Sequence, residues 1–172
     1  ERRIGRKPRR VPHYDAPAPS SAAEAIAQGE DAADQERHRL GLLHTPAANV
    51  VELVASQGIG VAAAPLQDGL TCLFLRVQQI GSMIAVNSTC DEVQRRFVLL
   101  HAYAHVLFER GAVLRASKPS SAGELIAKRA TAFANAFLLP EAGVREMLTS
   151  LGKGQPSRKG FVVLDAATDE ST

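Results

Sequence analysis

Two histidines, His101 and His105, are the side chains of this sequence best placed to do chemistry. They lie four residues apart in the helical pattern of residues 94–110, so both project from one helix face. Two imidazoles placed in this way can bind one zinc ion, as in the H-E-x-x-H helix of metallopeptidases. Histidines at this spacing also occur as ordinary surface or core residues. The motif's glutamate, which takes a proton from zinc-bound water, is replaced here by Ala102.

The sequence around the histidines carries a more specific pattern. The segment Arg95-Arg96-Phe97 leads into His101 and His105, and a second helical pattern follows at fixed offsets, with Ala130, Phe133, Ala134, Leu138, Leu139 and Pro140. Together these segments resemble the ImmA/IrrE family of zinc metallopeptidases, over roughly residues 47–148. The resemblance implies an endopeptidase that cleaves a transcriptional repressor in stress, phage or mobile-element control.

The resemblance also implies a third zinc ligand, a glutamate, at the position of Ala127, where a methyl group cannot bind metal. Both departures from the family therefore fall on functional carboxylates, at residues 102 and 127. Two explanations fit: deliberate Glu→Ala replacements that silence a peptidase, or a natural pseudo-enzyme that kept the fold. The identical truncation at both positions favours the first. In either case we expect no appreciable peptidase activity, and at most weak zinc binding by His101 and His105.

Three nearby residues are weaker candidates. Glu124 lies one turn before Ala127 and would need a shift of the helix by about 5.4 Å to replace it as a ligand. Glu109 lies one turn beyond His105, a poor position for a tetrahedral site, so it is expected to face solvent or to orient a histidine. Tyr103 points away from the histidines by helical phase and is expected to pack in the core.

Helical patterns surround this segment and predict an α+β fold. Ser20 or Ser21 can cap a helix that runs to about Arg39, with Glu24 completing a capping box. A second helix is expected from Thr45-Pro46, and two more over residues 122–138 and 141–151. The apolar faces expected to be buried comprise Val93, Phe97, Leu100, Ala104 and Leu107 in the histidine helix, and Val144, Met147 and Leu148 in the last helix.

Residues 59–66, 70–77 and 83–86 are short segments rich in Val, Ile, Leu and Ala, separated by turn residues. They predict a three-stranded antiparallel meander beside the histidine helix, with residues 112–121 as a loop. In peptidases an exposed strand edge can hold the substrate as an added strand, although a purely structural sheet needs no such role.

The composition favours one globular domain. The chain has 172 residues, 45% apolar and 22% charged, with a net charge of +2, which gives no global argument for nucleic acid or membrane binding. Two cysteines and no secretory signal favour a reduced cytoplasmic protein. We expect a basic, proline-rich arm over residues 1–19, a peptidase-like domain over residues 20–151 and an extension over residues 152–172. The alternative function is a non-catalytic module that binds a transcriptional regulator, or DNA through the basic arm.

Overall fold

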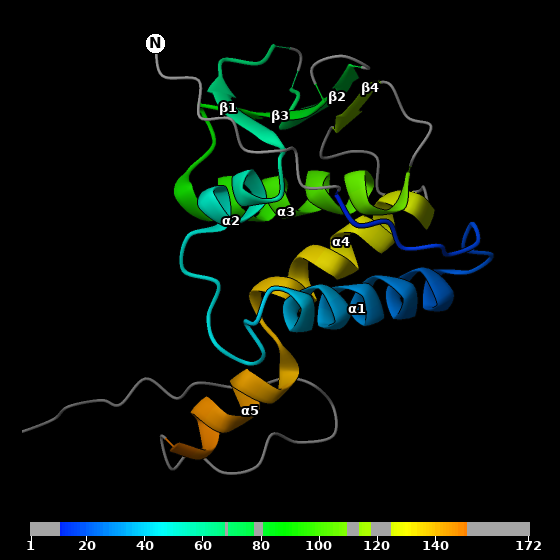
Figure 1. Cartoon of the computed structure of the whole chain (residues 1–172), viewed down its shortest axis with the longest axis vertical. Coiled ribbons are helices and arrows are strands. Elements are labelled where there is room, and N and C mark those ends of the chain that lie inside the picture. The colour runs from blue at the N-terminus through cyan, green and yellow to red at the C-terminus, as the bar shows by residue number, and fades with distance from the viewer. Residues whose placement is uncertain (1–10, 68, 78–80, 110–113, 118–124, 151–172) are drawn as a thin grey trace, which may run out of the picture.

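The computed structural model describes residues 11–150 except 68, 78–80, 110–113 and 118–124. Figure 1 shows a small sheet on one side of a central helix and a group of helices on the other. The elements are α1 (Ala22–Arg39), α2 (Val50–Ser56), β1 (Gly60–Ala64), β2 (Cys72–Val77), β3 (Gly81–Asn87), α3 (Glu92–Phe108), β4 (Leu114–Ser117), α4 (Leu125–Leu138) and α5 (Glu141–Ser150). The α+β class is confirmed.

Side-chain caps set where the first three helices begin. The Ser21 hydroxyl accepts the Glu24 N–H at 3.1 Å and starts α1 where the sequence predicts. Helix α2 begins later than Thr45-Pro46 because Asn49 is its cap. Helix α3, which carries the histidines, begins behind Asp91, whose carboxylate accepts the N–H of Gln94 in a capping box.

The sheet is not the predicted three-stranded antiparallel meander; that prediction was wrong in two respects. Its order is β1-β3-β2-β4, and β1 pairs parallel to β3, while β2 pairs antiparallel with β3 and β4. Asn87 holds the connection from β1 to β2, because its side-chain amide donates to the carbonyls of Leu66, at 3.1 Å, and Leu70, at 2.9 Å. Strand β4 comes from residues 114–117, inside the predicted loop.

Helix α3 is the central element, between the sheet and α4, and α1 packs along α4 (Figure 1). Its buried face includes Leu100, Ala104 and Leu107, as the apolar pattern predicts. The prediction that Val93 is buried was wrong. This side chain is 77% exposed, because no other element in the described part of the chain covers the first turn of α3 at that position. In α5, likewise, Leu148 is buried but Met147 is 63% exposed.

The described part of the predicted N-terminal arm contacts the body. The backbone N–H of Tyr14 donates to the Leu107 carbonyl at 3.0 Å, and its hydroxyl donates to the Glu36 carboxylate at 2.8 Å. These bonds tie the segment to α3 and α1. Within the portion covered by the structure, no helix is long and apolar enough to cross a membrane.

Gly29 allows α1 and α4 to pack closely. A Cβ atom at this position would lie 2.8 Å from the Ala132 Cβ and 2.9 Å from the Phe133 nitrogen, and closer still to the Arg129 carbonyl oxygen.

We therefore expect Gly29→Ala to lower the free energy of unfolding by about 1–3 kcal/mol through overpacking, although alanine favours helices by about 1 kcal/mol. Urea denaturation measures the change, with Ala27→Gly at an exposed position of α1 as the control for propensity alone. A more stable Gly29→Ala protein would contradict this account.

Candidate functional site

Helix α3 brings the two histidines together. The Nε2 atoms of His101 and His105 lie 3.3 Å apart, and the ring planes are steeply inclined. Two nitrogens each about 2.0–2.1 Å from a tetrahedral zinc ion lie about 3.3 Å apart. The spacing of the pair thus matches that of two ligands of one zinc ion.

Glu109 orients His105. Its Oε1 atom lies 2.6 Å from His105 Nδ1, and both side chains are largely buried. The carboxylate accepts the Nδ1–H, so the Nε2 lone pair of His105 faces His101. Metal-binding histidines commonly have a partner of this kind on the second ring nitrogen. Because Glu109 lies beyond the Nδ1 edge of the ring, it is placed as an orienting group rather than as a ligand beside the Nε2 atoms.

Thr131 of α4 supplies a contact for the other histidine that the sequence analysis did not identify. Its Oγ1 lies 3.4 Å from His101 Nδ1, so both Nδ1 atoms have polar partners. Position 131 is four residues after Ala127, so both lie on the α4 face that meets the histidines. That spacing is the signal by which Thr131 could have been found.

Ala102 and Ala127, the positions at which the resemblance of the sequence implies carboxylates, offer no donor atom. Ala102 is 1% exposed, and Ala127 is partly buried on α4. Among the residues that the structure describes, no three His, Cys, Asp or Glu side chains are grouped so that they could hold a metal ion. Glu124, the possible replacement ligand, lies outside the described residues. Within the described ranges, the groups present fit two zinc ligands with their orienting partners, but not a third ligand or a general base.

Tyr103, between the histidines in sequence, faces the opposite side of α3. It is fully buried, and its hydroxyl donates to the Glu36 carboxylate. Its predicted direction away from the histidines is confirmed, and its contact is polar as well as apolar. Burial and the charge of Glu36 raise the pKa of Tyr103 well above its usual range, so it remains a hydroxyl donor.

A buried arginine lies near the orienting carboxylate. The guanidinium of Arg129 lies 4.1 Å from the Phe108 ring centroid and donates to Gln28 Oε1 at 3.0 Å. Burial lowers the pKa of Arg129, and the charge of Glu109 acts in the opposite direction. Arg129 thus places a positive charge near Glu109 and links α4 to α1 and the end of α3.

Burial keeps His101 neutral. Desolvation, helped by the neighbouring His105 and opposed by Glu109, lowers the pKa of His101 to about 4. A neutral imidazole is the form that binds metal. At neutral pH the site therefore offers a deprotonated ligand at His101 without having to release a proton there.

A family model described as Peptidase M78, IrrE N-terminal-like domain, matches residues 54–156, which is more than half of the chain. The match includes both histidines, Ala102, Ala127 and Thr131. No curated protein matches the chain.

The lowered pKa of His101 predicts acid sensitivity of the metal-free protein. Between about pH 6.5 and pH 4 the unfolded state binds a proton at this residue and the folded state does not. The contribution of His101 to the free energy of unfolding is therefore fully present above about pH 6.5. About 3 kcal/mol of the free energy of unfolding is lost as the pH falls from 6.5 to 4. We expect the ring of His101 to titrate near pH 4 in NMR spectra of protein treated with a chelator.

His101→Asn should remove most of this pH dependence in urea denaturation. His38→Asn, at an exposed position of α1, should leave it in place. Titration of His101 near pH 6.5 would show that the ring is not desolvated as described.

Proposed function

Because the chain belongs to the Peptidase M78 family of IrrE N-terminal-like domains, we propose that it is a zinc-peptidase domain without hydrolytic activity. In this proposal it keeps the two histidine ligands and binds a protein of the family's substrate class, a transcriptional repressor, without cleaving it. The observation that carries the proposal is the 3.3 Å spacing of two oriented Nε2 atoms beside positions 102 and 127, which lack carboxylates.

Hydrolysis needs a base that these residues do not supply. A zinc ion would polarise a peptide carbonyl and activate a water molecule, and a carboxylate must accept the proton of that water. The methyl group of Ala102 cannot do so. Glu109 is a poor substitute, because its Oε1 is hydrogen-bonded to His105 Nδ1, on the far side of the ring from the Nε2 atoms.

Peptide binding needs neither missing carboxylate. An extended segment can add to the edge of a sheet through backbone hydrogen bonds alone, and among the strands that the structure describes the edge strands are β1 and β4. The scaffold around the site is intact, since α3 and α4 still pack against each other and carry His101, His105 and Thr131. These features support a binding role for a chain whose site lacks the cleavage groups.

The first test is the zinc content per chain, by elemental analysis, of this protein and of the Ala102→Glu/Ala127→Glu form. We expect well under one zinc for the former and about one for the latter, because a third ligand completes the site. Ala127→Glu alone should also gain zinc, which keeps the test valid if a buried glutamate at residue 102 impairs folding.

The matched control is Ala27→Glu/Ala55→Glu, which adds two carboxylates at exposed helix positions. It should not gain zinc. A folded Ala127→Glu form without zinc would refute the assignment of the histidines as ligands. Zinc-dependent cleavage of a repressor by the unaltered chain would refute the claim that hydrolysis is absent.

A second test concerns Glu109 as the orienting group. In the Ala127→Glu background, Glu109→Gln should weaken zinc binding by about 10–100-fold, because the amide no longer holds His105 Nδ1–H as a carboxylate does. Competition with a chromophoric chelator measures the affinity. Glu92→Gln, an exposed glutamate of the same helix, is the control and should leave affinity unchanged. Equal affinities of the two variants would show that Glu109 does not orient the ligand.

A further inference from the structure

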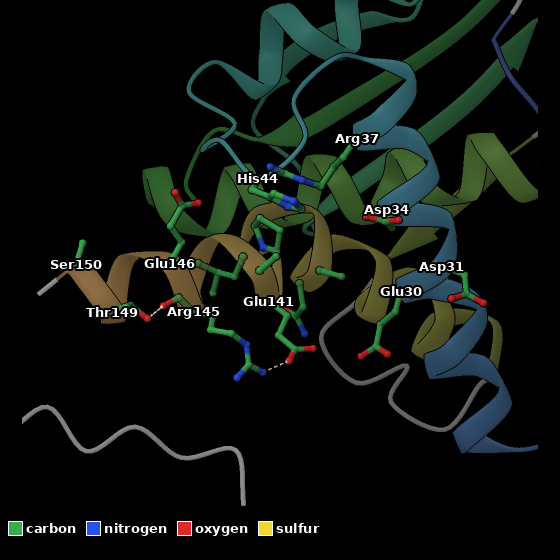
Figure 2. Close-up of a pocket in the computed structure, with 15 residues that line it drawn as sticks. Glu30, Asp31, Asp34, Arg37, His44, Glu141, Arg145, Glu146, Thr149 and Ser150 are labelled. Carbon is green, nitrogen blue, oxygen red and sulfur yellow. Dashed lines mark hydrogen bonds and ion pairs between the residues drawn. The ribbon is translucent and has the colours of Figure 1, made fainter. Parts of the chain in front are cut away.

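A groove between α1 and the α4–α5 corner has no part in the function proposed above. Its volume is about 1090 Å³, and none of its lining residues comes from α3. In Figure 2, Glu30 of α1 and Glu141 of α5 project toward the space between the two helices. The groove is therefore a second surface, separate from the histidine pair.

The groove is acidic. Five carboxylates line it, together with two guanidiniums, which leaves an excess of three negative charges when His44 is counted as neutral. Glu30, Asp31 and Glu146 are exposed and have no hydrogen bond or ion pair with any residue in the described part of the chain. Three carboxylates are thus available to a ligand from two different helices.

One of the two arginines is buried and hydrogen-bonded to backbone carbonyls of the fold. Arg37 is 1% exposed, and its guanidinium donates to the carbonyls of Leu43, at 2.8 Å, Thr45 and Phe137. The other, Arg145, pairs with Glu141 of its own helix at 2.5 Å. Within the described part of the chain, neither guanidinium forms a hydrogen bond or ion pair with the three available carboxylates, so the ligand-facing charge of the groove is negative.

An apolar side chain lies beside these charges. Leu139, at the corner between α4 and α5, lines the groove and is 69% exposed. A leucine this exposed within a groove can pack against an apolar side chain of a partner. Among the described residues, no three His, Cys, Asp or Glu side chains are grouped so that they could hold a metal ion, so the carboxylates of the groove do not form a site for a single cation.

We propose that this groove binds a basic amphipathic helix of a partner protein. Its lysine or arginine side chains pair with Glu30, Asp31 and Glu146, and an apolar side chain packs on Leu139. The excess negative charge disfavours nucleic acid, whose phosphates it repels. This inference goes beyond the proposed function, because it holds whether or not the histidine pair binds zinc.

The test uses ¹⁵N-labelled protein and a fluorescein-labelled 15-residue amphipathic peptide of lysine and leucine, with a glutamate–leucine peptide as its counterpart. We expect the basic peptide to shift the amide resonances of Glu30, Asp31, Leu139 and Glu146, and to bind more weakly as salt rises. Glu30→Lys/Asp31→Lys should weaken binding about tenfold in fluorescence anisotropy. Leu139→Ser should weaken it about fivefold.

The matched control is Glu52→Lys/Glu92→Lys, which makes the same charge change at exposed positions outside the groove. Equal weakening by this pair would attribute binding to net charge and overturn the proposal. So would the absence of binding at millimolar peptide, or unchanged affinity in Leu139→Ser. Groove resonances that shift with protein concentration alone, together with dimer in sedimentation, would assign the groove to a second copy of the chain instead.

Discussion

The buried carboxylate of Glu36 is the interaction on which the arrangement of the site depends. It is fully buried in α1 and accepts hydrogen bonds from the hydroxyls of Tyr14 and Tyr103 and from the Arg39 guanidinium. A buried charge is costly unless its oxygens are satisfied, so these donors must remain in place for the fold to be stable. Because Tyr103 projects from the side of α3 opposite the histidines, the bond to Glu36 fixes the rotation of α3. The direction of His101 and His105 is therefore set from the far side of their own helix.

The second constraint is on α4, which must present Ala127 and Thr131 to the histidines. Arg37 follows Glu36 in α1, and its guanidinium binds the last turn of α4 at the Phe137 carbonyl. Toward the other end of the contact between α1 and α4, Gly29 allows the two helices to pack closely. Adjacent residues of α1 thus position both walls of the site: Glu36 holds α3, and Arg37 holds α4. Arg37 also lines the acidic groove, so the site and the groove both depend on α1 for their position.

The sequence predicts the local features of the site and misses the features that depend on distant contacts. Helical phase gives the shared direction of His101 and His105 and the opposite direction of Tyr103, because both follow from 3.6 residues per turn. The parallel pairing of β1 with β3 was missed because the prediction joined strands in chain order, whereas β3 lies between β1 and β2. Met147 was assigned to the core because periodicity identifies an apolar face but not whether another element covers it. Thr131 was missed because its partner is 30 residues away.

Alanine at residues 102 and 127 limits the charge that the fold must bury around the histidines. Glutamates at residues 102 and 127 would bring two negative charges into a largely buried site, where only a cation could compensate them. With alanine at both positions, the ring nitrogens of both histidines have polar partners within the site: Glu109 accepts from His105 Nδ1, the two Nε2 atoms are in contact, and Thr131 lies against His101 Nδ1. A neutral His101 also adds no charge. Alanine at these two positions therefore adds no buried charge that a metal ion would have to compensate.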